Sequence, residues 1–103
     1  MLWILDHDGN PVHLGMDFLE WSTWFEHNNR EVRCDVVGGV LVATIFLGID
    51  RSWEMSGKPV LWESMIFGGP LNLTCQCYDS AAAALEGHNE LVLLVKNAGE
   101  KRI

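Results

Sequence analysis

The sequence EVRCDVVGGVLVATIFLGID, residues 31–50, decides the fold. Over its first seven residues apolar and polar side chains alternate, which is typical of a strand with one buried face. The apolar side carries Val32, Cys34 and Val36. The polar side carries Arg33 and Asp35.

Two glycines, Gly38 and Gly39, follow this strand and predict a two-residue hairpin turn. The next segment, residues 40–49, is apolar on both sides. A strand of this kind is covered on both faces. We therefore expect a central strand. Either other parts of this protein cover both of its faces, or a helix covers one face and a partner covers the other.

Two further strands continue the sheet. Residues 59–67 form an apolar strand that ends at Gly68-Gly69-Pro70, and residues 71–78 alternate again. The apolar side of this last strand carries Leu71, Leu73, Cys75 and Cys77. We expect both thiols to be small core residues, because they lie on this apolar side. No second cysteine pair or histidine cluster stands at zinc-site spacing. We therefore predict no metal site.

The ends of the chain supply a hairpin and two helices. Residues 2–5 and 12–14 form short strands around the turn-forming DHDGNP, and residues 16–28 form a helix. Its apolar stripe is predicted to face the core and contains Leu14, Phe18, Trp21 and Phe25. A second helix runs from Ala81 to about Asn97, with residues 98–103 as a frayed tail.

The order of these elements predicts an α+β fold. We expect one domain over residues 1–103, in which an antiparallel four-stranded meander is covered by two helices, with a short N-terminal hairpin. This is a two-layer sandwich.

The amino-acid composition of the chain narrows the class of partner that we expect it to bind. The formal charge is −7, from 14 acidic and seven basic residues, which argues against a nucleic-acid surface. It permits docking on a basic protein, and it is equally typical of a charge that keeps a small domain soluble. No run reaches the length of a membrane span, and the N-terminus does not resemble a secretory signal. We expect a cytoplasmic protein with reduced cysteines, no cofactor, and a host or phage protein as its partner.

Two ionisable residues lie where apolar ones are expected. Glu63 shares one side of its strand with Met65 and Phe67, and His88 lies at the centre of the second helix's apolar stripe. A buried carboxylate and a buried imidazole each require a partner. We predict that Glu63 and His88 contact each other, either as a structural pair or as the acid–base pair of an enzyme.

The polar loop at residues 50–58 contains a second candidate site. Trp53, Glu54 and Met55 lie in it, and an exposed tryptophan is typical of interface hot spots. Trp53 can equally fold back over the core.

Three segments carry a resemblance to known sequences. They are TIFLGID (Thr44–Asp50), PVLWESMIFGGPL (Pro59–Leu71) and YDSAAAALEGH (Tyr78–His88). Together with the N-terminal WILDHDGNPV and EWSTWFE, they make the chain similar to a family of short hypothetical proteins of phages, prophages and bacteria. The resemblance implies a phage-like origin and no catalytic residue. At three positions, Trp62, Cys75 and Cys77, the chain departs from the sequence pattern of this family.

Three functions fit these observations. The first is a non-enzymatic module that binds and inhibits a host defence or nucleic-acid-handling protein. The second is a small enzyme or ligand-binding protein that uses Glu63 and His88. The third is a structural protein that homodimerises through an edge strand or through Trp53.

Overall fold

The four-stranded antiparallel sheet predicted from residues 31–78 forms the centre of the molecule. The computed structural model describes residues 2–52 and 58–100. The elements in chain order are β1 (Leu2–Leu5), β2 (Pro11–Gly15), α1 (Phe18–His27), β3 (Glu31–Val37), β4 (Val40–Phe46), β5 (Trp62–Phe67), β6 (Cys75–Tyr78) and α2 (Ala81–Glu100). The α+β class is confirmed, with a two-stranded sheet β1-β2 and a four-stranded sheet β3-β4-β5-β6.

The four strands follow one another as a meander. β3, β4, β5 and β6 pair antiparallel in chain order, so that β4 and β5 are central and β3 and β6 are edges. Gly38 and Gly39 have φ values of 54° and 82°. Both lie in the left-handed region that a type I′ turn requires, and glycine adopts it without steric cost. The hairpin prediction is therefore confirmed.

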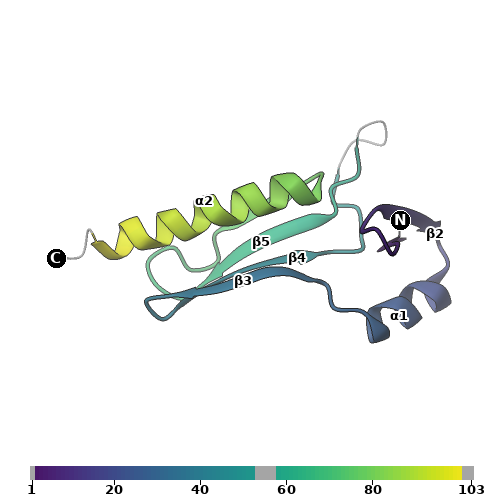
Figure 1. Ribbon diagram of the computed structural model, residues 1–103, viewed down its shortest axis with the longest axis horizontal. Coiled ribbons are helices and arrows are strands. Elements are labelled where there is room, and N and C mark those ends of the chain that lie inside the picture. Colours follow the sequence, from purple (N-terminus) through teal and green to yellow (C-terminus); the bar gives the residue numbers. More distant parts are fainter. Residues whose placement is uncertain (1, 53–57, 101–103) are drawn as a thin grey trace.

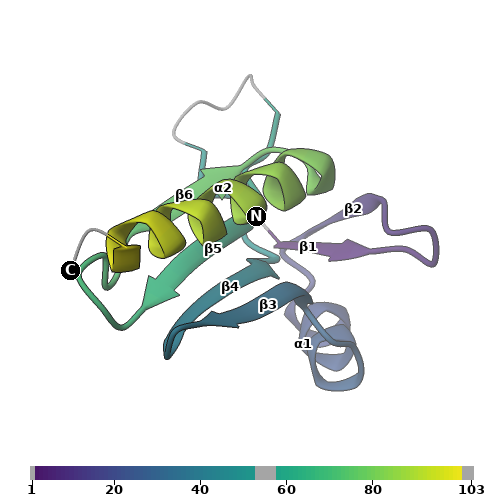
Figure 2. The ribbon, with the colours of Figure 1, turned by 60° about the vertical axis from the view of Figure 1, so that its left-hand side comes forward.

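One face of this sheet is covered by α2, which runs across it along the long axis of the molecule (Figure 1, Figure 2). Two clusters of buried side chains fill the interface. The first contains Val42, Ile66, Leu91 and Val95, and the second contains Phe46, Leu61, Trp62 and Ala84. Full burial of one such large apolar side chain contributes about 1.5–3 kcal/mol to folding. The sheet and α2 therefore form the main core.

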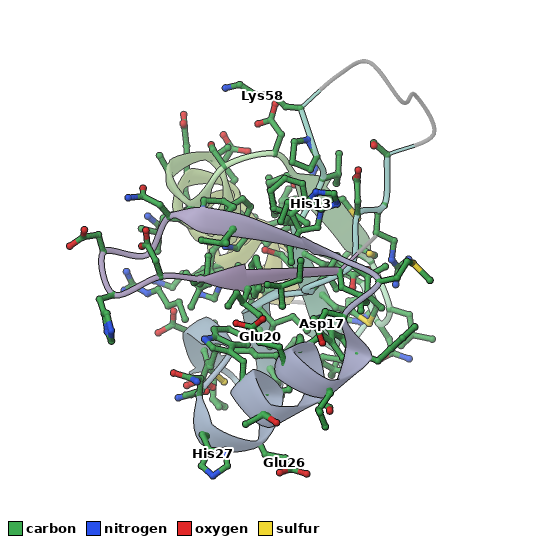
Figure 3. All side chains as sticks on the ribbon, turned by 90° about the vertical axis from the view of Figure 1, so that its right-hand side faces the viewer. His13, Asp17, Glu20, Glu26, His27 and Lys58 are labelled. Atoms are coloured by element: carbon green, nitrogen blue, oxygen red, sulfur yellow. The ribbon has the colours of Figure 1, made fainter. Side chains whose placement is uncertain are left out.

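The first helix differs from the expectation that two helices cover the sheet. α1 lies beside β1 and β2, at the end of the sheet (Figure 1, Figure 3). Its side chains reach the sheet only at this end, where the ring of Trp24 lies 5.7 Å from that of Phe46. The Trp21 Nε1–H donates to the Gly48 carbonyl at 3.1 Å. No α1 residue is buried, and Phe18, predicted to be in the core, is exposed.

The end of the meander also differs from the prediction. Residues 71–74 form a turn and β6 begins only at Cys75, because Leu73 adopts a left-handed φ of 68° that a strand does not accommodate. Leu73 is exposed rather than in the core, while Leu71 packs against the first cluster.

Close contact between α2 and the ring of Tyr78 depends on a glycine. A Cβ atom at Gly87 would meet the Tyr78 ring and its hydroxyl group, whereas one at Gly99 would meet nothing within 4 Å. We predict that Gly87→Ala lowers the free energy of unfolding by about 1–3 kcal/mol through overpacking. Gly99→Ala, the matched control in the same helix, should be neutral or slightly stabilising. Urea unfolding measures both, and equal effects would contradict the prediction.

Candidate functional site

The imidazole of His88 is fully buried between α2 and the sheet, with 0% of the residue exposed. Its Nδ1 lies 2.6 Å from the Thr44 hydroxyl group, and its Nε2 lies 2.7 Å from Oδ2 of Asp35. The prediction that this histidine belongs to the buried stripe of the helix is confirmed. Its two partners come from β4 and β3, and neither of them is Glu63.

The polar contacts continue from Thr44 across the sheet. Thr44 and Ser64 are direct cross-strand partners on β4 and β5, and their hydroxyl oxygens lie 2.5 Å apart. Both residues are fully buried. One arrangement of protons satisfies the whole chain: Ser64 donates to Thr44, Thr44 donates to Nδ1 of His88, and Nε2–H donates to Asp35.

Asp35 is the solvent-facing end of this chain of hydrogen bonds, which we call the His88 network (Asp35, His88, Thr44 and Ser64). Its carboxylate also accepts from Nε of Arg33 at 3.1 Å. The hydrogen bond with His88 holds the pKa of Asp35 below its usual range, with burial acting in the opposite direction and Arg33 adding to the decrease. The network therefore contains an ionised carboxylate at neutral pH.

The His88 network contains the residue types of a hydrolytic relay, but these residues are not placed where a substrate could reach them. A nucleophile must reach a substrate, and the hydroxyl groups of Thr44 and Ser64 are both sealed beneath α2. A buried polar chain in which each group has a partner fixes the packing of a helix on a sheet. We therefore interpret the His88 network as structural.

The predicted contact between Glu63 and His88 is wrong, because the two residues lie on opposite faces of the sheet. Residue 64 faces α2, so residue 63, its neighbour in the strand, faces away. Oε1 of Glu63 instead lies 2.7 Å from Sγ of Cys75, and Oε2 lies 4.0 Å from Arg51.

The prediction that Cys75 and Cys77 are core residues is also wrong. Both cysteines are exposed on β6, on the face that carries Glu63. Partial burial of the Cys75 thiol, followed by its hydrogen bond to Glu63, raises the pKa of Cys75 to about 12. This thiol is therefore protonated at neutral pH and donates to the carboxylate.

The side of the sheet opposite α2 has no covering helix or strand among residues 2–52 and 58–100 (Figure 1). We call it the uncovered face, and strand pairing assigns eleven residues to it. They are Glu31, Cys34, Val36, Leu41, Ala43, Ile45, Glu63, Met65, Phe67, Cys75 and Cys77. Glu31 and Glu63 are its charged members, and the rest of the surface is apolar or thiol-bearing. Val36 is 71% exposed and Phe67 is 42% exposed.

The sequence-based prediction of which side of β3 is buried is wrong. The side with Cys34 and Val36 is uncovered, whereas the polar side with Arg33 and Asp35 faces α2. His88 requires a partner for each ring nitrogen; the prediction met this requirement with Glu63, whereas a polar strand face beneath the helix supplies both partners. Asp35 and Ser64 were not identified from the sequence for this reason.

The remaining site prediction concerns the polar loop. Trp53, Glu54 and Met55 lie outside the described residues. Within the described part of the chain, neither helix has the length and apolar character required to cross a membrane.

Comparison with known proteins adds no relative. No protein-family model, no curated protein and no solved structure matches the chain.

Removing the central hydroxyl group of the His88 network should destabilise the fold. Thr44→Val leaves Nδ1 of His88 and the Ser64 hydroxyl group buried without their partner. We expect the free energy of unfolding to fall by about 1–3 kcal/mol. Thr23→Val, on the exposed surface of α1, is the control and should change it by less than about 0.5 kcal/mol. Urea titrations monitored by circular dichroism compare the two, and a stable Thr44→Val protein would refute the structural role.

The lowered pKa of Asp35 predicts a pH dependence of stability. A carboxyl whose pKa is lower in the folded state contributes stability above its unfolded pKa of about 4 and loses it as the pH falls through the folded value. The melting temperature of wild type should therefore exceed that of Asp35→Asn at pH 7, and the difference should narrow below about pH 4. Asp8→Asn, in the exposed β1–β2 turn, is the control. A difference that stays constant from pH 7 to pH 3 would contradict this assignment.

Proposed function

We propose that the chain is a non-enzymatic protein-binding module that docks through the uncovered face. One observation carries the proposal: a central strand of the sheet is apolar on both sides, but only one side is covered. Val42, Thr44 and Phe46 of β4 lie under α2. The alternate residues Leu41, Ala43 and Ile45 open onto the uncovered face.

The size of the uncovered face supports a binding role. Four strands of about six residues, spaced about 4.8 Å apart with a rise of about 3.4 Å per residue, span a flat area on the order of 400 Å². Apolar patches of a few hundred Å² on monomeric proteins often mark binding sites. The area is small for an obligate dimer, which buries about 1,000 Å² or more per subunit, and it suits a partner that binds reversibly.

The net charge favours a different protein over a second copy. Two chains of charge −7 repel each other, whereas a basic protein is attracted. A partner with an apolar patch rimmed by lysine and arginine therefore fits best. The resemblance to phage and prophage proteins adds a more specific form of the proposal, in which the partner is a host protein whose basic groove is blocked.

Charge placed on the uncovered face should abolish binding while the fold survives. Val36→Lys/Phe67→Lys adds two charges at exposed positions of β3 and β5. Leu93→Lys/Leu94→Lys, the matched control, adds the same charges at exposed positions of α2. A partner isolated from bacterial lysate is purified and its affinity for each variant measured directly. We expect the face variant to lose about tenfold or more in affinity, the control to keep wild-type affinity, and binding to weaken with salt.

Two outcomes would contradict the proposal. Equal affinity of the two double variants would exclude the uncovered face as the docking surface. Sedimentation equilibrium gives the second outcome: a wild-type dimer that Val36→Lys/Phe67→Lys dissociates would show that a second copy, not another protein, occupies the face.

A further inference from the structure

A cluster of three side chains of metal-ligating types lies at one edge of the uncovered face. Glu63, Cys75 and Cys77 each present one ligand atom, and these atoms all lie within 4.8 Å of one another. The cluster is separate from the His88 network, which lies on the opposite face of the sheet. It also does not depend on the proposed docking function, because it is defined by side chains of this chain alone.

Strand geometry brings the three side chains together. Cys75 and Cys77 are two residues apart on β6, so both point to the same side of the sheet. Glu63 on β5 is the direct cross-strand partner of Cys77, and Cys75 pairs with Met65 beside it. Directly opposed residues have Cβ atoms about 5 Å apart, which places the carboxylate next to both thiols. The backbone that holds the cluster is part of the sheet, so the cluster needs no rearrangement of the chain to form.

We propose that Glu63, Cys75 and Cys77 bind a borderline-soft divalent cation, for which Zn²⁺ is the best fit. Thiolates select against Mg²⁺ and Ca²⁺, and a mixed set of thiolate and carboxylate ligands suits Zn²⁺. Zn–S bonds of about 2.3 Å place tetrahedral ligands roughly 3.8 Å apart. The spread of the three atoms therefore matches a tetrahedral site after small side-chain rotations.

The environment of Glu63 supports a cation at this position. The Glu63 side chain is only 13% exposed, and its nearest described polar contacts are the Cys75 thiol at 2.7 Å and Arg51 at 4.0 Å. A carboxylate removed from water in this way is stabilised by a full positive charge close to it. On binding, each thiol releases its proton to solvent and its sulfur donates an electron pair to the metal, so no oxidation or reduction takes place.

Three protein ligands leave the fourth tetrahedral position open. β6 is an edge strand, and both cysteines are exposed, so this position faces solvent. An open fourth position is typical of zinc sites that accept water or an outside ligand. Arg51 lies beside Oε2 of Glu63, which leaves Oε1, the atom next to Cys75, as the ligand oxygen.

The test is a titration of the reduced, metal-free protein with Co²⁺, a spectroscopic substitute for Zn²⁺. Thiolate ligation gives a sulfur-to-cobalt charge-transfer absorption, and tetrahedral geometry gives intense visible bands. We expect both to saturate at one Co²⁺ per chain and to disappear when equimolar Zn²⁺ is added. Cys75→Ser and Cys77→Ser should each weaken binding by about tenfold or more. Glu63→Gln should weaken binding but retain the charge-transfer absorption.

Cys34→Ser is the matched control. Cys34 is an exposed cysteine of the same uncovered face, but it lies on β3, at the opposite edge of the sheet. This variant should bind Co²⁺ as wild type does, and circular dichroism melts should show that all four variants are folded. No saturable charge-transfer absorption in wild type would overturn the proposal. Equal loss of binding in Cys34→Ser and Cys77→Ser would overturn it as well.

Discussion

The burial of one imidazole determines how this molecule is assembled. His88 lies at the centre of α2, the helix that covers the four-stranded sheet in the described part of the chain, and it requires a partner for each ring nitrogen. Thr44 and Asp35 supply these partners from one face of the sheet. Docking α2 on the other face would leave the imidazole without them, at a cost of several kcal/mol for a buried polar group. The histidine thus selects the covered face, and the apolar side chains of β4 and β5 complete the core around it.

This selection has a consequence for the rest of the surface. Because the covered face includes Arg33 and Asp35 of β3, the side of that strand with Cys34 and Val36 is left open together with half of β4 and β5. α1 does not compensate, since it packs at the end of the sheet against the N-terminal hairpin (Figure 3). The molecule is accordingly elongated, measuring 51 × 30 × 21 Å, and its apolar area is divided between a closed core and an open sheet surface.

The sequence predicts the helices and strands well, but it predicts poorly which side of each strand is buried. Alternation in β3, the Gly38-Gly39 pair and the stripe around His88 were sufficient for the strand order and for the burial of the histidine. They were insufficient to decide which side of the meander α2 covers, because β5 carries large apolar residues on both sides: Trp62 and Ile66 on one, Met65 and Phe67 on the other. That single ambiguity produced the errors at Glu63, Cys75 and Cys77 and hid the role of Asp35. The reason is physical, since the period of a strand specifies alternation but not which of its two faces is inward.

All three cysteines of the chain open onto the uncovered face. An exposed thiol forms a disulfide bond with a neighbouring molecule only when an oxidant is present, and more slowly where burial and neighbouring carboxylates raise its pKa, as they do at Cys34 and Cys75. In this protein such a bond would form on the uncovered face itself. Two copies linked in this way would cover each other's uncovered face, which each copy exposes to other proteins when its cysteines are reduced. The redox state of the surroundings would therefore determine how much of this surface is available, with no change in the fold.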